Sequence, residues 1–410
     1  MCIRDRNYND KNIDFIVFGG GITSDVLSLI LNNENKQFYV LDDNKNDTLV
    51  NSPSSLALSP SSMNLLNYFE IDFPFEKLNE MRVYESDLSN NKIKSELIFN
   101  NEKTLSYVVK YNDLKDSLLK KTRSLKNRLN LENFLSFDLE KNFIKLVMKD
   151  GKEIFAKNII FTQKIDSTLL SQFKLSYKEK NYNQKAIVAT LDHKDSHEGV
   201  AYQYYDNGKP LALLPLSKSK DLYRSSLIWS LDDYLADDIL SNQDLKHVLH
   251  EKIGHLYKDI NISEGPLSFD LDKFLLKGKT DKRLIFVGDS VRMMHPMAGQ
   301  AWNQSLRDVS YIADALFESK NLGIDLISTP SFNSFKRIRK IESEGITNSI
   351  DFINYIYTLD TSISKGFRRN LMKFVNFVKP INKLLVSEAE GGILRRPSLL
   401  LGEKPGSKRI

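Results

Sequence analysis

The 410-residue sequence contains a single cysteine, Cys2, and no apolar run that reaches the roughly 18 residues of a membrane-spanning helix. One cysteine excludes an internal disulfide and any metal site built from several thiolates. We therefore expect a reducing, cytoplasmic location. Cys2 lies in the opening MCIRDR, which we interpret as part of a non-native leader, residues 1–12, outside the fold.

The sequence also has no large excess of positive or negative residues, except near the end of the chain. Lys and Arg number 58 against 53 Asp and Glu. Residues 365–410 hold 11 basic and 3 acidic residues, so the part before them is close to neutral, with 47 basic and 50 acidic residues. This balance argues against a nucleic-acid partner. With 41% hydrophobic residues, a chain of this length favours two intimately joined domains.

The opening of the chain has the pattern of a strand, a turn, a helix and a second strand. Residues 14–18 form a short apolar run that ends in three glycines, and residues 22–33 repeat apolar side chains at helical spacing. A second apolar run, residues 37–43, closes in acids. The pattern predicts a β-α-β unit with a right-handed crossover, typical of a nucleotide-binding domain.

The three glycines form the turn of this unit. Gly19 and Gly21 occupy the first two glycine positions of G-x-G-x-x-G, Gly20 lies between them, and Ser24 takes the third position. Glycine lets a pyrophosphate approach the backbone N–H groups. Asp42, 23 residues after Gly19, can accept hydrogen bonds from a ribose. The alternative is a turn that only connects a strand to a helix, and the motif alone does not separate FAD from NAD.

Two later regions have residue patterns that predict different secondary structures. Residues 185–230 contain short β-rich runs with a turn at residues 206–208, and they predict an antiparallel sheet. Residues 283–289 return to the pattern of a buried strand, and residues 301–317 place apolar side chains on one face of a helix. The region after residue 346 has a helical pattern.

The most specific signal is the string GDSVRMMHPMAGQAWNQSLRDV, from Gly288 to Val309. It resembles the hydroxylases of ubiquinone biosynthesis within the FAD-dependent aromatic monooxygenases, which are para-hydroxybenzoate hydroxylase-like flavoproteins. In that family an acid at a strand end holds the ribityl chain, and HPxAGQGxN opens a helix whose positive end faces a flavin that becomes anionic when reduced. Together the glycine turn and the resemblance imply these cofactor-binding residues: Gly19, Gly20, Gly21, Ser24, Asp42, Gly288, Asp289, Pro296, Ala298, Gly299, Gln300, Ala301 and Asn303.

The resemblance covers nearly the whole chain and implies its fold class. We expect an α/β protein with an α+β substrate part: a Rossmann-like FAD-binding domain, an inserted antiparallel-sheet substrate domain, and C-terminal helices. The expected ranges are 13–80, 101–175 and 270–345 for the discontinuous FAD-binding domain, 81–100 and 176–269 for the substrate domain, and 346–410 for a C-terminal helical region with a basic tail.

The resemblance also implies an activity. NAD(P)H reduces the FAD, molecular oxygen adds to the reduced ring, and the C4a-hydroperoxide hydroxylates a prenylated phenol or quinone precursor of ubiquinone. Because the cofactor carries this chemistry, we assign no catalytic acid or base. Gln203, Leu214, Pro215 and His295 are the expected substrate residues, the first three on a sheet that faces the flavin.

The chain departs from the family pattern at three places. Ser54 stands where an arginine usually contacts FAD, and Ala301 replaces the last glycine of AGQG. The family's Ala-Asp-Gly motif, associated with FAD and the pyridine nucleotide, is replaced by Thr162-Gln163-Lys164. Because of these departures, an alternative interpretation stays open: the protein is a degenerate flavin-binding subunit of a quinone-biosynthesis complex and has no turnover of its own. A nicotinamide dehydrogenase is a third alternative, but it leaves the downstream string unexplained.

Three histidines, His247, His250 and His255, are spaced as metal ligands could be. They lie on a predicted amphipathic helix with no supporting carboxylate pattern, so we interpret them as surface residues and assign no metal. No nucleophile elbow with a Ser/His/Asp arrangement is visible.

The basic tail contains a candidate amphipathic helix, interrupted by Pro380. Its apolar residues at helical spacing are Phe367, Leu371, Phe374, Val378 and Ile381. A polyprenylated phenol resides in the bilayer, which favours peripheral contact with the inner face of the cytoplasmic membrane. The alternative is that the apolar stripe packs on the FAD-binding domain. Other enzymes of ubiquinone biosynthesis are further candidate partners.

Overall fold

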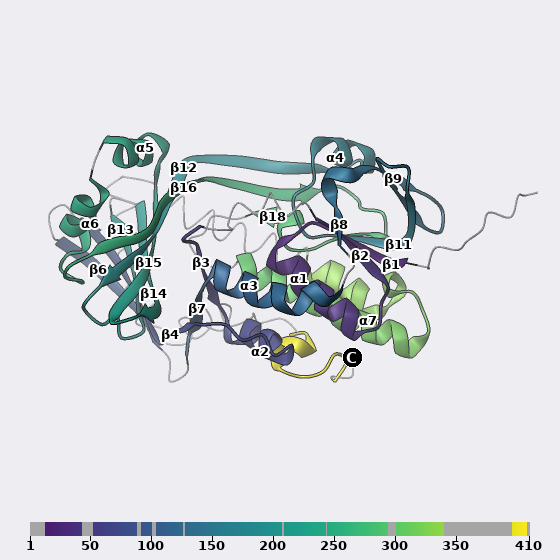
Figure 1. The fold of residues 1–410 in the computed structure, drawn as a ribbon, viewed down its shortest axis with the longest axis horizontal. Helices are drawn as coiled ribbons and strands as arrows, with labels where there is room; N and C mark the ends of the chain where they lie inside the picture. Colours follow the sequence, from purple (N-terminus) through teal and green to yellow (C-terminus); the bar gives the residue numbers. More distant parts are fainter. Residues whose placement is uncertain are drawn as a thin grey trace, which may run out of the picture.

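The computed structural model describes residues 13–42, 52–87, 92–100, 104–125, 128–206, 209–242, 244–293, 301–339 and 396–407. They form two bodies that lie side by side (Figure 1). Two long strands, β12 (Ser176–His193) and β16 (Asn261–Lys277), run from one body to the other. These strands pair with each other in antiparallel register from one end to the other. The two bodies are therefore joined by a paired ribbon.

The first body is built on a seven-stranded sheet in the order β8-β2-β1-β11-β10-β9, with β17 also paired to β11. Its strands are β1 (Ile13–Phe18), β2 (Phe38–Asp42), β8 (Arg128–Asn130), β9 (Phe134–Leu139), β10 (Ile144–Met148), β11 (Glu153–Phe161) and β17 (Leu284–Phe286). The pairs β1–β2, β2–β8, β1–β11 and β11–β17 are parallel, whereas β9–β10 and β10–β11 are antiparallel. The carboxyl ends of five parallel strands consequently lie at one edge of the sheet, where ligands bind in open α/β sheets.

Three helices pack together beside this sheet: α1 (Gly21–Asn33), α3 (Tyr111–Thr122) and α7 (Ala301–Leu322) (Figure 1). Apolar residues of α1 at helical spacing, such as Ile22, Val26 and Ile30, are fully or almost fully buried in the core between helices and sheet. A second core, on the other side of the strands, includes residues of α4 (Ser167–Phe173), β9 and β10. The sheet is thus covered on both faces, as parallel sheets require.

The second body is an eight-stranded sheet in the order β18-β16-β12-β15-β14-β13-β5-β6. Its other strands are β5 (Glu80–Asp87), β6 (Lys92–Asn100), β13 (Val200–Asp206), β14 (Lys209–Ser219), β15 (Leu222–Asp232) and β18 (Arg292–Met293). Helices α5 (Asp233–Asn242) and α6 (Leu245–Ile253) contribute to the core on one face. We expected an antiparallel sheet, but β13 and β5 are parallel. These two strands come from distant parts of the chain, so no tight hairpin turn imposes an antiparallel arrangement on them.

A small three-stranded sheet, β3 (Ser55–Leu58), β7 (Ser106–Lys110) and β4 (Glu76–Leu78), lies between these parts, next to α2 (Pro60–Tyr68). Residues 396–407 return to the first body and contact α2 and α7. Leu399 and Leu400 are buried in its core. The end of the expected basic tail therefore packs on the first body, whereas residues 340–395, which hold the candidate membrane helix, lie outside the described residues.

The fold class predicted from the sequence is confirmed: the protein mixes helices with one largely parallel and one largely antiparallel sheet. None of the helices in the described part of the chain combines the length and the apolar character that a membrane crossing requires.

The aromatic cluster around Phe161 gives a test of the first body. Phe161 is fully buried at the end of β11, with its ring stacked on Phe286 at 4.7 Å and tilted against Phe18 at 5.3 Å. We expect Phe161→Ala to lower the free energy of unfolding by about 3–5 kcal/mol, because it leaves a cavity among packed rings. Urea denaturation followed by circular dichroism measures this change. Leu135→Ala, at a 60% exposed position of β9, is the matched control, with an expected change below about 0.5 kcal/mol. Equal effects of the two substitutions would contradict the assignment of this core.

Candidate functional site

Backbone conformation, close neighbouring atoms or both favour glycine at each position of the turn between β1 and α1. Gly19 and Gly21 have φ angles of +117° and +80°, in the region that favours glycine. A Cβ atom on Gly20 would lie 2.2 Å from Oδ1 of Asp42, and one on Gly19 would lie 2.6 Å from Oγ1 of Thr162. The turn is therefore pressed against the ends of β2 and β11. It leads into the amino terminus of a 13-residue helix, where free N–H groups favour a phosphate.

The first turn of α1 also meets the second predicted motif. A Cβ atom on Gly288 would lie 3.3 Å from Cγ2 of Thr23 and 2.9 Å from Oγ of Ser305 on α7. Ser24, at the third glycine position, is completely buried. Among the described residues, the hydroxyls of Thr23 and Ser24 find no hydrogen-bond partner. The structure thus brings the glycine turn and the Gly288 turn together, although they are more than 260 residues apart.

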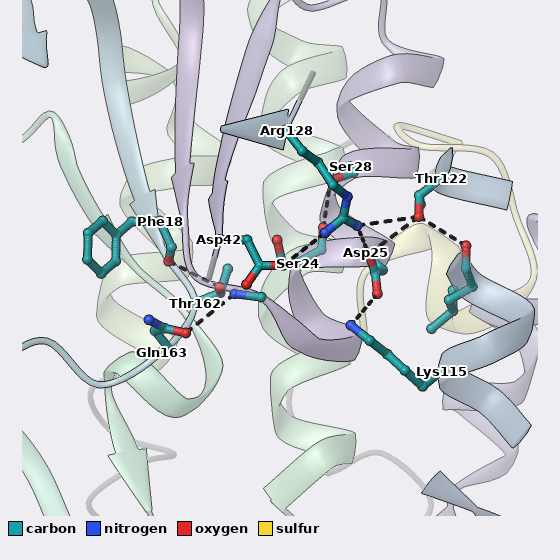
Figure 2. A network of polar contacts seen from close by, with 12 residues as sticks. Phe18, Ser24, Asp25, Ser28, Asp42, Lys115, Thr122, Arg128, Thr162 and Gln163 are labelled. Carbon is teal, nitrogen blue, oxygen red and sulfur yellow. Dashed lines mark hydrogen bonds and ion pairs between the residues drawn. The ribbon is translucent and has the colours of Figure 1, made fainter. Parts of the chain in front are cut away.

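Asp42 ends β2 beside the glycine turn, and its carboxylate accepts a hydrogen bond from Nη1 of Arg128 at 2.9 Å. The other nitrogen of the same guanidinium, Nη2, contacts Asp25 on α1 (Figure 2). Asp25 also pairs with Lys115 of α3, at 2.9 Å. Asp25, Lys115 and Arg128 are not among the site residues expected from the sequence. The available signal was Asp25 itself, an acid within an otherwise apolar helical pattern.

The segment Thr162-Gln163-Lys164 follows β11 and closes over the glycine turn. The backbone N–H of Thr162 donates to the carbonyl oxygen of Phe18 at 2.9 Å, and its hydroxyl donates to the same oxygen at 3.2 Å. Oε1 of Gln163 accepts a long hydrogen bond, 3.4 Å, from N–H of Gly20 (Figure 2). A neutral amide therefore occupies the place next to the turn at which the family has a carboxylate.

Lys164 points away from this turn. Its ammonium pairs with Glu179 at 2.7 Å and lies 4.8 Å from the ring centroid of Phe274 on β16. Both partners are on the strands that connect the two bodies. Lys164, which takes the place of the glycine in the family motif, thus has its own structural contacts.

The Gly288–Asp289 turn follows β17 and is held from several sides. The N–H of Gly288 donates to Oδ2 of Asp308 on α7 at 2.8 Å. Ser290 accepts from N–H of Val287 at 2.9 Å, and its hydroxyl lies 2.8 Å from the carbonyl oxygen of Phe161. These contacts fix the backbone on both sides of Asp289 and leave its side chain exposed.

Many protein atoms lie close to the carboxyl group of Asp289, although its side chain keeps surface that solvent can reach. The surrounding low-dielectric protein raises the pKa of Asp289 to about 6, and the nearby charge of Arg292 opposes this shift. A raised pKa means that the folded protein holds the proton more tightly than the unfolded chain, so this group's contribution to stability falls as pH rises from about 4 to about 6. Above that range the carboxylate is ionised and is an acceptor for hydroxyl groups.

Asn303, expected to contact the cofactor, has partners within the protein. Its side-chain oxygen accepts from N–H of Ser59 at 2.9 Å and from the hydroxyl of Ser62 at 2.8 Å, and its side-chain nitrogen donates to the carbonyl oxygen of Ala57 at 3.0 Å. Asn303 therefore ties α7 to the end of β3 and the start of α2. Ala301 begins α7. The other residues expected here, His295, Pro296, Ala298, Gly299 and Gln300, lie outside the described residues.

The expected substrate wall is divided between two faces of the second sheet. Gln203 and Leu214 share a face, since Gln203 lies opposite Ala212 and strand residues alternate. Pro215 is paired with Ser225, whose hydroxyl contacts His193 on the opposite face. Because Pro215 directly follows Leu214 along the strand, both cannot face the same side. Pro215 is thus placed away from the face that Gln203 and Leu214 share.

The face of Gln203 and Leu214 is turned toward the small sheet that contains β3. Leu214 lies opposite Ser226, whose hydroxyl accepts a hydrogen bond of 2.8 Å from Ser55 on β3. Gln203 is buried and donates through Nε2 to the hydroxyl of Tyr205 at 2.9 Å. Ser54, at the position of the family's arginine, immediately precedes β3. This surface combines apolar side chains with a few polar groups, which suits an aromatic ligand.

The donor set at this edge fits FAD. N–H groups of a glycine turn can face a pyrophosphate, Asp42 stands next to that turn as an acceptor for a ribose, and Asp289 is an accessible acceptor for ribityl hydroxyls. The fold itself is that of flavin monooxygenases. The p-nitrophenol 4-monooxygenase of Pseudomonas putida superposes with a TM-score of 0.69 at 14% identity, over 94% of this chain and all of that one. HpxO of Klebsiella pneumoniae, solved with FAD and uric acid, also gives 0.69 at 12% identity, over 93% of this chain and 98% of that one.

Residues 12–321 match the family described as FAD binding domain, and the chain belongs to this family. Among curated relatives, the ubiquinone hydroxylase UbiL of Rhodospirillum rubrum is 25% identical over 64% of this chain and 59% of that protein. A mitochondrial ubiquinone biosynthesis monooxygenase of Dictyostelium discoideum is 22% identical over 93% of this chain and 92% of that protein. The chain spans less than two thirds of the length of several curated relatives that it matches, including UbiL. The predicted family and the predicted cofactor, FAD, are confirmed.

The raised pKa of Asp289 predicts a pH dependence of FAD binding. Below about pH 6 the carboxyl is protonated and accepts hydrogen bonds less strongly, so we expect the dissociation constant for FAD to rise about tenfold between pH 7.5 and pH 5. Asp289→Asn should bind FAD about tenfold more weakly at pH 7.5 and lose this pH dependence. Flavin fluorescence titration of the deflavinated protein measures both.

The matched control is Asp270→Asn, which changes an exposed carboxylate on β16. It should keep the affinity and the pH curve of the unmodified protein. An unchanged pH curve in Asp289→Asn would remove Asp289 from the cofactor site.

Proposed function

We propose that this protein is an FAD-dependent monooxygenase that hydroxylates a prenylated phenol in ubiquinone biosynthesis, with NAD(P)H as reductant and molecular oxygen as co-substrate. The observation that carries the proposal is the meeting of two turns at one sheet edge. The glycine turn with Asp42 and the Gly288 turn with Asp289 come from opposite ends of the family match, and the Gly288 turn lies against the side chain of Thr23 in the first turn of α1. An FAD molecule bound at this edge would contact both turns, one with its pyrophosphate and the other with its ribityl chain.

The protein's part in this reaction is binding, orientation and the exclusion of water. Gly19 to Gly21 would hold the pyrophosphate, Asp42 the ribose and Asp289 the ribityl chain, while the bound flavin supplies the redox chemistry. The face that carries Gln203 and Leu214 would hold the aromatic ring. Both assignments rest on this chain's geometry and on the names of its relatives, two of which are ubiquinone hydroxylases.

The test is a turnover assay with a panel of phenols that differ in prenyl chain length and ring substitution. The purified holoprotein should oxidise NADH or NADPH faster when a prenylated phenol is present, and product should form in proportion to the nucleotide consumed. Nucleotide oxidation that yields only hydrogen peroxide with every phenol would contradict the proposed substrate class.

A second function is favoured by one observation, the replacement of the family's acid by Gln163. The amide of Gln163 contacts Gly20, where it meets the turn proposed for the pyrophosphate. A protein that binds FAD but is not reduced by NAD(P)H would then be a non-catalytic flavin subunit of a biosynthetic complex. Anaerobic mixing with NADH or NADPH separates the two functions, because only the monooxygenase loses its yellow colour.

Restoring the family motif tests this segment directly. We expect Gln163→Asp combined with Lys164→Gly to leave unchanged, or to raise by up to about tenfold, the rate of flavin reduction by NAD(P)H, because one additional charge-assisted hydrogen bond contributes about 1.5 kcal/mol. Stopped-flow absorbance measures this rate. Lys164→Gly alone, which breaks the contact with Glu179 but restores no acid, is the control. A marked fall in the combined variant alone would mean that this chain uses the segment differently.

Peripheral membrane contact through the basic tail belongs to the same proposal, since a polyprenylated substrate resides in the bilayer. We expect the intact chain to float with anionic liposomes and a chain that ends before Lys365 to bind them more weakly, because each basic residue near an anionic surface contributes about 1 kcal/mol at best. Neutral liposomes and a thermal unfolding measurement are the controls. Since residues 396–407 pack in the first body, a second variant should keep these residues and neutralise Arg368, Arg369 and Lys373 instead. Equal flotation of the intact chain and both variants would exclude the tail.

A further inference from the structure

Asp25 is a buried charge on the helix that follows the glycine turn. Its side chain has no accessible surface. One oxygen accepts a hydrogen bond from Lys115 at 2.9 Å, and the other contacts Arg128 and lies 3.4 Å from the hydroxyl of Thr122. These partners come from α3 and the segment after it, about 90 to 100 residues further along the chain. Asp25 therefore joins α1 to α3 and β8.

Arg128 connects this buried acid to Asp42. One nitrogen of its guanidinium contacts Asp25 and the other donates to Asp42 at 2.9 Å, so that one planar group spans two carboxylates (Figure 2). A guanidinium has this fork geometry, whereas an ammonium is a single point charge. The Arg128 side chain is 26% exposed and that of Asp42 9%, so the pair lies at the boundary of the candidate site.

Stability alone does not explain this arrangement. Two acids and two bases taken from water cost desolvation energy, and apolar residues of similar volume often serve as well or better in such a place. The network does, however, restrict Asp42. Asp42 is the last residue of β2, its carboxylate is held by Arg128 on the neighbouring strand, and its Oδ1 lies 2.2 Å from the place that a Cβ atom on Gly20 would take. Its orientation toward the glycine turn thus depends on where Arg128 is held.

We infer that Asp25 is a positioning residue for the adenosine half of FAD: through Arg128 it orients the Asp42 carboxylate beside the glycine turn. The inference rests on the proposed role of Asp42 in cofactor binding. It assigns a function to a residue that has no exposed surface for contact with the cofactor. The consequence is selective, because the flavin half of FAD is assigned to the Gly288 turn and does not depend on this network.

The experiment compares ligands that carry each half of the cofactor. The deflavinated protein is titrated calorimetrically with ADP, with riboflavin and with FAD. The principal variant is Asp25→Leu combined with Lys115→Met, which removes one acid and one base together and leaves no buried unpaired lysine. We expect this variant to bind ADP and FAD about tenfold more weakly and riboflavin unchanged, as for the loss of one well-oriented charge-assisted hydrogen bond.

Arg128 supplies the second variant and the coupling test. Arg128→Lys keeps the charge but cannot span both carboxylates, so it should weaken ADP binding by a similar factor. In an Arg128→Met background, the Asp25 and Lys115 substitutions should have no further effect on ADP affinity, because the connection is already broken. Asp14→Asn with Lys157→Met removes an ion pair of 2.9 Å elsewhere in the same sheet and should leave all three affinities unchanged.

Each other outcome overturns a particular claim. Equal weakening of ADP and riboflavin would mean a general loosening of the fold, which thermal unfolding of the same samples would also show. Loss of ADP binding in the Arg128 variants, with none in the Asp25 variant, would mean that Arg128 acts without Asp25. Asp42→Ala is measured in parallel. If Asp42→Ala binds ADP as the unmodified protein does, the proposed cofactor site is wrong. If Asp42→Ala loses ADP affinity and the Asp25 variant does not, only the positioning role of Asp25 is wrong.

Discussion

The close approach of the glycine turn to the ends of the neighbouring strands is the constraint on which the rest of the site depends. With Oδ1 of Asp42 2.2 Å from the place of a Cβ on Gly20, no other residue fits without displacing the carboxylate. The same closeness brings the helix amino terminus, with its free N–H groups, next to an acid. A cofactor with a diphosphate and a ribose needs both groups within a short distance.

The end of β11 extends this arrangement to the second turn. The carbonyl oxygen of Phe18 receives two hydrogen bonds from Thr162, and the carbonyl oxygen of Phe161 receives N–H of Val287 and the hydroxyl of Ser290. Both turns are thus tied to one strand. The segment that begins at Thr162 lies between them, because β11 pairs with β1 on one side and with β17 on the other.

Charged side chains restrain two parts of the site, the carboxylate of Asp42 and the Gly288 turn. Arg128 restrains Asp42 from the side of β8, and Asp308 restrains the Gly288 turn from the side of α7. Asp308 in turn lies 2.5 Å from Arg339, and both are buried. Charged groups in such places are costly unless paired, and each of these two acids pairs with at least one basic group from another part of the chain.

Local patterns in the sequence were enough to determine the elements and the chemistry of the turns. The glycines and the helical spacing after them predicted a β-α-β unit, and the string that begins at Gly288 implied FAD by its resemblance, because each of these signals is contained in one short stretch of the sequence. The pairing of distant residues was decided only by the tertiary structure. Asp25 meets Arg128 across 103 residues, and Leu399 packs in the core of a domain that begins at the other end of the chain.

The same distinction applies to two residues of the expected site. Asn303 was expected at the cofactor because of its place in a motif, and in the structure its amide contacts β3 and α2. Pro215 follows Leu214 directly, so the strand turns it to the other face. A sequence pattern specifies a residue's type and its element through local backbone preferences. Which neighbour each side chain meets depends on how the elements pack, and that is settled by burial and charge pairing between segments far apart in the chain.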